Sequence, residues 1–428
     1  MKISTRLSPV AIAVAALCLS PLAFADSSSS AVSNSLKNSH LNVGRMKYDS
    51  PTTATVDGSV LQNASGNLSL NVASGLQNQQ SNAAAITNDS SNGRTKNQHA
   101  VAANSQDTYF NYDTQISDTS DDASLSGNAM RGASGNINSN IASGVFNQQH
   151  NGLAIVSGKD GMADASSANS QMSSMYSLEN YYMTNNAGLS GYALSGATGN
   201  VGANIASGMG NQQSNNLSVA SVKKGSANAA IGSLQGLTGA PAPAPETSNP
   251  QYVISTDLDN NASISGNALT GASGNVGVNI ASGDINQQAN NTAISRSGGG
   301  SMATAVAAAG QQMTYLDPTD TGVQDSATIN GHAGQGASGN IALNVAAGAE
   351  NQQQNGLAMA VASNAAMGTA TAPVEQVADF NGGNSACSDY NSTVSGYTLT
   401  GATGNISLNV ASGNGNQQTN TLAIASSQ

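Results

Sequence analysis

Residues 262–294 read ASISGNALTGASGNVGVNIASGDINQQANNTAI, and this 33-residue block occurs six times without an internal gap. In every copy a Gly-Asn pair is followed, twelve residues after the Gly, by Asn-Gln-Gln. A block that keeps its length while its neighbours vary is a structural unit that stacks on its own copies. The sequence therefore predicts an all-β fold, a β-solenoid of stacked, cross-β-like layers with variable segments between them. The six copies are Ala54–Ile86, Ala123–Ile155, Ala187–Val219, Ala262–Ile294, Ala327–Met359 and Ser392–Ile424.

The composition agrees with a repetitive structural protein. The 428 residues include 47 Gly and no Trp, and only 8% are charged, against roughly 25% in an ordinary soluble domain. Such a chain cannot build a large core from bulky side chains. The net charge of -11 is spread thinly and no dense basic patch exists, which argues against nucleic acid as a partner. Low charge also permits self-association.

The N-terminal residues predict export. Lys2 and Arg6 precede the apolar stretch Val10–Leu19, and Ala23-Phe24-Ala25 forms a small-x-small cleavage site. Residues 1–25 are therefore expected to be a signal peptide, and residues 26–53 a flexible, Ser-rich leader. No later stretch is long and apolar enough to predict a transmembrane helix. The expected mature chain holds one cysteine, Cys387, so no internal disulfide is predicted.

The segments between blocks are half-units of a longer repeat. Each contains a run of small residues that ends in Gln, and these glutamines lie 65, 64, 76 and 65 residues apart. The third segment is longest because it contains the proline-rich insert Ala240–Pro245. The pattern leaves open how many strands the half-units add; their charge predicts that they lie outside a fibre core. These half-units are residues 87–122, 156–186, 220–261, 295–326 and 360–391, with the glutamines Gln106, Gln171, Gln235, Gln311 and Gln376.

Within the block the hydrophobic period is two. Ile264, Val276, Val278 and Ile280 alternate with polar or small residues, which is typical of half-buried strands. We expect three short strands near Ser263–Leu269, Asn275–Ala281 and Asn286–Ile294, punctuated by Gly. By composition, Ala303–Ala309 in the next half-unit has helical propensity.

Asparagine occupies fixed positions in all six blocks. When identical layers stack, each side-chain amide can donate to the copy on one side and accept from the copy on the other. A column of Asn satisfies itself, whereas a column of Asp or Lys would repel itself. The alternative interpretation, that Asn and Gly only favour turns, does not explain the fixed spacing. The predicted ladder contains Asn71, Asn140, Asn204, Asn279, Asn344, Asn409, Asn78, Asn147, Asn211, Asn286, Asn351 and Asn416, and a later Asn in each block (Asn82, Asn151, Asn215, Asn290, Asn355, Asn420) would extend it.

Charged residues are rare within the blocks. Asp284 and Glu350 lie in the variable gap between Gly and Asn-Gln-Gln, which predicts a surface turn. A charge is therefore expected to be tolerated at Ile285 better than at Asn279.

No catalytic, cofactor-binding or metal-binding residue is predicted. The four histidines, at positions 40, 99, 150 and 332, never pair at ligand spacing. The acidic run Asp118, Asp121 and Asp122 lacks the spacing of a calcium loop. Tyr192 and Tyr397 share one block position but form no continuous aromatic stripe. An enzyme is therefore not expected.

The repeats resemble those of Fap-type bacterial functional amyloid subunits, with a weaker likeness to curlins. The likeness rests on the export signal, the Gly/Ala/Asn/Gln-rich repeats of thirty-odd residues and the variable segments between them. One departure is that Fap-type subunits typically carry a Cys-x-x-Cys near the end, whereas this chain has only Cys387 in that region. The resemblance implies an extracellular cross-β fibre in a biofilm matrix.

Two functions remain open. One is an exported subunit that polymerises with itself, helped by a secretion pore, a nucleator or a related fibre subunit. The alternative is a monomeric β-solenoid adhesin at the cell surface that binds a receptor or matrix component. Monomeric solenoids cover their last layer with an atypical cap. Here the sixth block is a full copy followed by Ala425–Gln428, which favours the polymer.

Overall fold

The computed structural model describes residues 28–40, 46–89, 97–110, 113–175, 177–239, 253–316, 318–363, 365–380 and 384–427. The expected signal peptide at residues 1–25 and the insert at 240–245 lie outside these residues. No helix in the described part of the chain is both long and apolar enough to cross a membrane.

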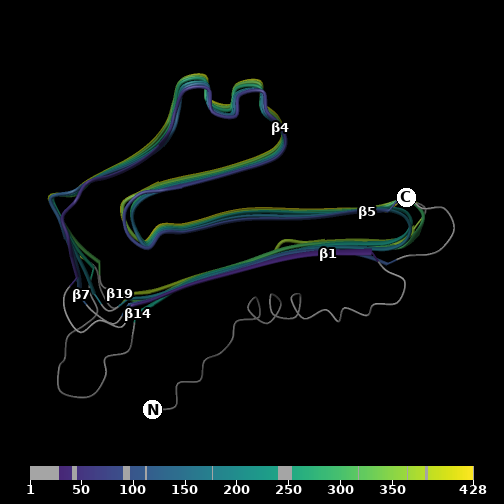
Figure 1. Cartoon of the computed structure of the whole chain (residues 1–428), viewed down its shortest axis with the longest axis horizontal. Helices are drawn as coiled ribbons and strands as arrows, with labels where there is room; N and C mark the ends of the chain where they lie inside the picture. The colour runs from purple at the N-terminus through teal and green to yellow at the C-terminus, as the bar shows by residue number, and fades with distance from the viewer. Residues whose placement is uncertain are drawn as a thin grey trace, which may run out of the picture.

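The described chain folds into four sheets in which parallel strands pair in register (Figure 1). An 11-stranded sheet, here called the long sheet, consists of β1 (Ser28–His40), β5 (Gln79–Asp89), β6 (Gln98–Phe110), β10 (Gln148–Met175), β14 (Gln212–Gly239), β18 (Gln287–Ser297), β19 (Gly300–Leu316), β23 (Gln352–Ala362), β24 (Ala365–Thr371), β25 (Val374–Phe380) and β29 (Gln417–Ser427).

The other three sheets have six strands each. The corner sheet contains β2 (Met46–Tyr48), β7 (Asp113–Ser117), β11 (Ser177–Tyr181), β15 (Val253–Thr256), β20 (Pro318–Thr321) and β26 (Asn384–Ala386). The upper sheet contains β3 (Thr52–Val56), β8 (Ser120–Leu125), β12 (Thr184–Leu189), β16 (Asp259–Ile264), β21 (Gln324–Ile329) and β27 (Asp389–Val394). The central sheet contains β4 (Ser65–Ala73), β9 (Ser134–Val145), β13 (Thr198–Met209), β17 (Ser273–Asp284), β22 (Ser338–Ala347) and β28 (Thr403–Ser412).

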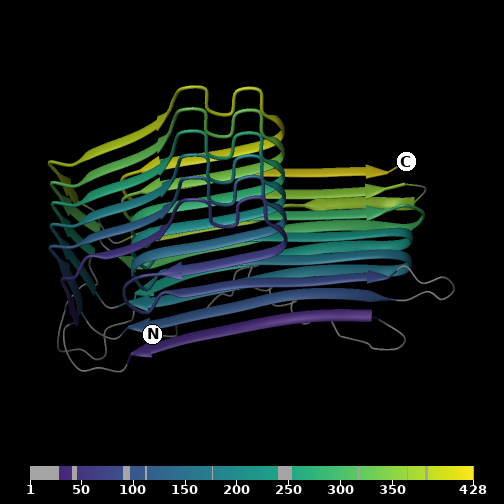
Figure 2. The same cartoon turned by 45° about the horizontal axis from the view of Figure 1, so that its top comes forward.

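Each layer is one winding path through all four sheets. The chain enters along the long sheet, passes the corner and upper sheets, turns back through the central sheet, and returns along the long sheet (Figure 1). Layer 1 is β1 to β5, and layer 6 is β24 to β29. Strands β10 and β14 have two arms, the first ending one layer and the second beginning the next. Figure 2 shows the layers rising from the purple β1 to the yellow β29.

The pairing register follows the repeat. In the central sheet the Gly of each Gly-Asn pair lies opposite the Gly of the next block, so partners are 69, 64, 75, 65 and 65 residues apart. These glycines have positive φ, for example 108° at Gly199. A β-carbon on Gly199 would clash with the carbonyl oxygen of Gly135 in the layer below, which explains why the position is always Gly.

The expected flexible leader is wrong. Residues 28–40 form β1, which pairs along its whole length with β6, and β2 and β3 follow at Met46–Tyr48 and Thr52–Val56. Asn34 and Ser35 lie opposite Asn104 and Ser105. The leader is therefore the half-unit of layer 1.

The half-units lie inside the stack, contrary to the expectation that their charge keeps them outside the core. Their strands form the second arm of the long sheet and all of the corner sheet. The expected helix at Ala303–Ala309 is also wrong, because these residues lie in β19 and pair with Ala227–Ser233 of β14. The neighbouring layer supplies the backbone partners, and it overrides an Ala-rich helical propensity.

Two of the three strands expected in each block are confirmed, and one is displaced. In the fourth block β17 covers the expected range and β18 begins one residue later than expected, at Gln287, but the first strand, β16, ends at Ile264. Residues 266–271 form a turn, because Gly266, Leu269 and Gly271 all have positive φ. The strands of the middle layers are also more buried than the alternation suggests: Val276–Asp284 is buried on both faces.

Three apolar cores run along the stack. The first lies between the upper and central sheets and contains Val276, Val278 and Ile280. The second lies between the two arms of the long sheet and is built mainly from Ala, which lets the arms approach closely. The third fills the corner, around Ile116, Phe146 and Met183. The amide columns lie between these cores.

Candidate functional site: the amide columns

The central sheet carries a continuous Asn column on the face opposite the first core. Asn279 Nδ2 donates to Asn204 Oδ1 at 2.9 Å, and Asn344 Nδ2 donates to Asn279 Oδ1 at 2.9 Å. The remaining contacts in this column are 2.9–3.1 Å long. From Asn140 to Asn344 these side chains are fully buried. The column consists of Asn71, Asn140, Asn204, Asn279, Asn344 and Asn409.

A second Asn column on the first arm of the long sheet faces the first. Asn290 Nδ2 donates to Asn215 Oδ1 in the preceding layer at 2.8 Å and to Asn279 Oδ1 in its own layer at 2.9 Å. Asn279 Nδ2 in turn donates to Asn215 Oδ1 at 3.1 Å. The two columns therefore bind the central sheet to the long sheet as well as layer to layer. This column consists of Asn82, Asn151, Asn215, Asn290, Asn355 and Asn420.

A third Asn column sits at the turn between the central and long sheets. Asn286 Nδ2 donates to Asn211 Oδ1 at 3.0 Å and to the carbonyl of Gly348 at 2.9 Å. The backbone N–H of Asn286 also donates to Asn211 Oδ1, at 3.0 Å. The side chain of Asn286 thus hydrogen-bonds to the turn of its own layer and to the turns of the preceding and following layers. The column consists of Asn78, Asn147, Asn211, Asn286, Asn351 and Asn416.

Two glutamine columns follow the turn and have opposite directions. Gln287 Nε2 donates to Gln212 Oε1 in the preceding layer at 2.9 Å. The adjacent Gln288 Nε2 donates instead to Gln353 Oε1 in the following layer, at 2.8 Å. A further column joins the second arms, where Gln311 donates to Gln235 at 2.8 Å. The fixed spacing of Asn-Gln-Gln in the sequence predicts further columns, and these contacts confirm them for both glutamines.

The columns hold the register of the layers. A buried amide needs both a donor and an acceptor, and the equivalent amide of the next layer supplies them. A slip of one residue along a strand would turn every amide to the opposite face and leave it against apolar groups. The arrangement therefore offers recognition of an identical layer, and it contains no ionisable group.

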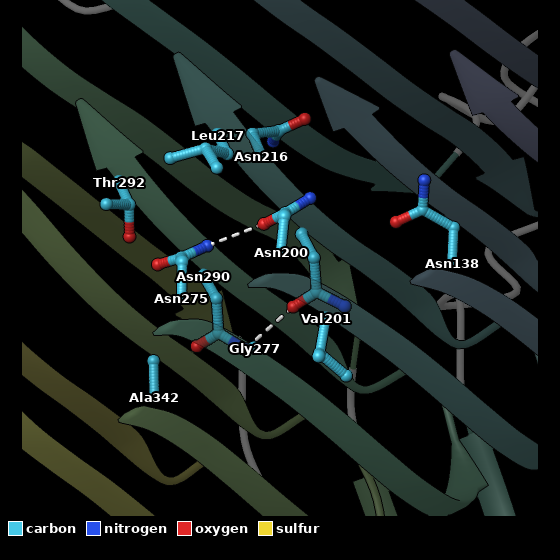
Figure 3. Close-up of a pocket in the computed structure, with 11 residues that line it drawn as sticks. Asn138, Asn200, Val201, Asn216, Leu217, Asn275, Gly277, Asn290, Thr292 and Ala342 are labelled. Atoms are coloured by element: carbon cyan, nitrogen blue, oxygen red, sulfur yellow. Dashed lines mark hydrogen bonds between the residues drawn. The ribbon is translucent and has the colours of Figure 1, made fainter. Parts of the chain in front are cut away.

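A shallow hollow opens beside these columns where Gly277 has no side chain (Figure 3). Asn275 Nδ2 donates to Asn200 Oδ1 at 2.9 Å along its wall. A β-carbon on Gly277 would lie 2.7 Å from Asn215 Oδ1, so Gly leaves room for the Asn column. The lining residues carry no charge, and the hollow offers hydrogen bonds without an acid or a base.

The expected surface position of Asp284 and Glu350 is wrong. Both side chains are buried, as is the neighbouring Ile285, which belongs to the third core. In other layers the position of Asp284 holds Val145 or Met209. The two residues between Gly and Asn-Gln-Gln therefore form a bend whose side chains point into the third core. These residues vary because the side chains around them in the corner differ from layer to layer.

Asp284 belongs to a buried acidic group in the corner. Asn180 donates to Asp284, Asn260 Nδ2 donates to Asp325 Oδ1 at 2.8 Å, and Asn414 Nδ2 donates to Asp320 Oδ2 at 2.5 Å. Burial raises the pKa of Asp284 and of Asp325 to about 7 and also raises the pKa of Asp320, with repulsion among these carboxyls adding to the effect on Asp284 and Asp325. In another layer, burial raises the pKa of Asp121 to about 6. The donors come from half-units and from other layers, which is why no spacing rule predicted these contacts.

The remaining candidate groups lie away from the amide columns or are neutral within the stack. Burial lowers the pKa of His150 to about 3, so this ring is neutral in the stack. In the described residues no three His, Cys, Asp or Glu side chains gather as a metal site would require. Tyr192 and Tyr397 lie exposed on the outer turns, where Tyr397 stacks on His332 with ring centroids 5.1 Å apart. Cys387 is exposed and free.

Comparison with known proteins relates the chain to functional amyloid subunits. A family model described as the functional amyloid protein FapB/FapC family matches residues 27–222 and 240–427. The functional amyloid subunit FapC of Pseudomonas aeruginosa (strain PAO1) is 31% identical over 295 residues, covering 63% of this chain and 85% of that protein. No solved structure gives a significant match.

Proposed function

This chain belongs to the functional amyloid protein FapB/FapC family, and from that membership we propose that it is exported and polymerises end to end into extracellular cross-β fibres of a biofilm matrix. The family is one of structural subunits, so the chain is not an enzyme. Its main partner is a further copy of itself. A secretion pore, a nucleator or a related subunit would assist assembly, and adhesion to surfaces would follow from the fibre.

One observation carries the proposal: the Asn columns and the Gln80 column run through all six layers, so the faces of layers 1 and 6 present matching amides. Asn71 and Asn409 are the terminal members of one unbroken column. Val394 and Ile406 on the layer 6 face are 50% and 37% exposed, although their equivalents in the middle layers are buried. Covering them with the apolar residues of another layer 1 would be favourable, at about 25 cal/mol per Å² of apolar surface.

The charge distribution supports the same proposal. The net charge of -11 is small for 428 residues, so repulsion between copies is weak. The corner carboxyls are the main concentration of buried charge, and their raised pKa values allow them to be neutral in the stack.

The test uses the purified chain that begins at Asp26. We expect unbranched fibres in electron micrographs, a diffraction spacing of about 4.8 Å along the fibre axis, and a lag phase that preformed seeds shorten. If the protein stays monomeric at high concentration even with seeds, the fibre proposal is wrong. The monomeric adhesin then becomes the better hypothesis, to be tested on immobilised matrix components.

A further inference from the structure

The donors and acceptors on the two open faces are complementary. In the Asn columns every layer donates to the preceding layer, so Asn71 presents a donor on the layer 1 face and Asn409 presents an acceptor on the layer 6 face. The Gln80 column runs the other way, because Gln80 donates to Gln149 and Gln353 donates to Gln418. There layer 6 presents the donor. Both kinds of column would continue without interruption if layer 1 of one stack lay on layer 6 of another.

Two stacks facing each other with the same end could not achieve this pairing. Two identical faces can meet only about a two-fold axis, which turns the strands antiparallel and takes every column out of line with its own copy. The only complementary occupant of the layer 6 face is therefore a layer 1 face, and the resulting contact is head to tail.

One column would nevertheless fail at this contact. In the second arm of the long sheet, Gln376 donates to Gln311 at 2.8 Å, and the column continues down to Gln106. The position opposite Gln106 in layer 1 is Leu36. At a joint between two stacks Leu36 would cover Gln376, whose Oε1 would be buried without a donor.

A backbone hydrogen bond would also be missing. At the start of the upper strands of layers 3 to 6 the N–H donates to the layer below: for example, Asp259 N donates to the carbonyl of Met183, and Asp389 N donates to the carbonyl of Val323. The equivalent residue before β3 is Pro51, which has no N–H. The carbonyl of Ser388, which is equivalent to that of Val323, would receive no donor from Pro51 at the joint. Proline on an exposed sheet edge hinders the addition of a further strand.

This inference assumes the proposed self-assembly and adds which two faces meet in it. We infer that the layer 6 face binds the layer 1 face of a second copy of this chain in the same register, and that Leu36 and Pro51 make this joint weaker than the joints between layers 2 and 6 of one copy. Each residue removes one hydrogen bond that those joints have, and Leu36 also leaves the joint between layers 1 and 2 without its amide contact. The two residues therefore raise the concentration of soluble chain that is in equilibrium with fibres, and they make the joint between copies the place at which a fibre breaks.

The test replaces each residue by its counterpart in a repeating position. Leu36→Gln restores the amide column, and Pro51→Ser introduces the residue that Ser120 provides in layer 2. The measurement is the concentration of soluble chain that remains in equilibrium with fibres. We expect each substitution to lower it about tenfold, the effect of one hydrogen bond, and the double substitution to lower it further. Sonicated fibres of the double variant should also break into longer fragments.

A matched control and a second measurement separate the joint from general stability. Met302→Gln changes an exposed side chain of layer 5 and should leave the equilibrium concentration unchanged. Urea unfolding of the soluble chain measures any gain in the free energy of unfolding of a single copy. That gain is subtracted from the free-energy change calculated from the equilibrium concentration. If wild-type fibres form but neither substitution lowers the equilibrium concentration, the inferred joint is wrong while the fibre function stands. If no variant polymerises even with seeds, both the function and the joint are wrong.

Discussion

Asn290 Nδ2 donates to Asn279 Oδ1 at 2.9 Å, and the same oxygen accepts a second hydrogen bond from Asn344 Nδ2 at 2.9 Å. The first contact joins two sheets within a layer, and the second joins two layers. A single buried carbonyl oxygen therefore holds the stack together in two directions. This arrangement repeats in the first five blocks, and it explains why Asn occupies this position in each of them.

Replacing Asn279 by Asp should destabilise the stack. A carboxylate can accept but cannot donate, so it would face the oxygens of Asn204 and Asn215 without a hydrogen. We expect a loss of about 1–3 kcal/mol in the free energy of unfolding, measured by urea unfolding of the soluble chain. Asn88→Asp, at an exposed position of β5, is the matched control. Equal losses in the two variants would contradict the role of the column.

Ile285→Asp should also be costly, which reverses the expectation from sequence. Ile285 is only 1% exposed and packs in the corner core, so a charge there would be buried. We expect a loss of about 3 kcal/mol or more and slower fibre formation. Val60→Asp, at a position that is 39% exposed, provides the comparison. A stability close to wild type for Ile285→Asp would place this bend outside the core.

Stability should fall as the pH rises through neutrality. The pKa values of Asp284 and Asp325 are about 7 in the stack, above their ordinary value of 3.8. Their contribution is therefore fully present below about pH 4 and is lost as the pH rises through 7. Denaturation at pH 5 and pH 8 should show a more stable chain at pH 5, and the double variant Asp284→Asn/Asp325→Asn should reduce the difference. Asp57→Asn, on an exposed turn, should leave it intact.

His150 should act in the opposite direction at lower pH. Its pKa is about 3 in the stack, below the ordinary value of 6.5, so its contribution is present above pH 6.5 and is lost as the pH falls through 3. Gln354 occupies the same column position in layer 5, which makes His150→Gln a compatible replacement. This variant should lose less stability than wild type between pH 6 and pH 3. If the variant and wild type lose the same free energy of unfolding between pH 6 and pH 3, His150 is not buried in its neutral form.

A lysine in the last layer should stop growth at that end. Asn409→Lys would put a cation on the layer 6 face, where the next layer must donate an amide hydrogen, and urea unfolding of the soluble variant would measure the cost of losing the contact with Asn344. Thr400→Lys is the control, because Arg131 occupies the equivalent position on the outer turn of layer 2. We expect wild-type seeds that are first exposed to the Asn409 variant, which caps the layer 6 end, and then to wild-type chain to elongate from one end only, observed by fluorescence microscopy. Elongation from both ends would contradict the polarity of the columns.

The parallel stacking could be predicted from the fixed block length, and the strands around Val276 and Gln288 could be predicted from their period of two. The same spacing pointed to the asparagines that the structure brings together. The half-unit of layer 1 escaped detection because Leu36 replaces the glutamine that marks the other half-units. The Asn-Ser pair at residues 34–35, shared with residues 104–105, was the remaining signal.

The other errors have a common physical cause. The Ala-rich run at Ala303–Ala309 and the charged bend at Asp284 were judged from local composition, which favours a helix and a surface turn. In the stack, each layer is enclosed by two others, so both the backbone partners and the burial of a residue are decided about 65 residues away. A pattern read along one strand does not contain that information.

The two-armed strand β10 has a consequence for the length of the molecule. Because each layer begins in the second arm, Ala163 of one layer lies opposite Ala227 of the next. Deleting residues 163–226 would join Met162 directly to Ala227 and remove one complete turn of the chain while every remaining column stays in line. The height of the stack can therefore be shortened or extended by whole layers, while the first and last layers keep their sequences.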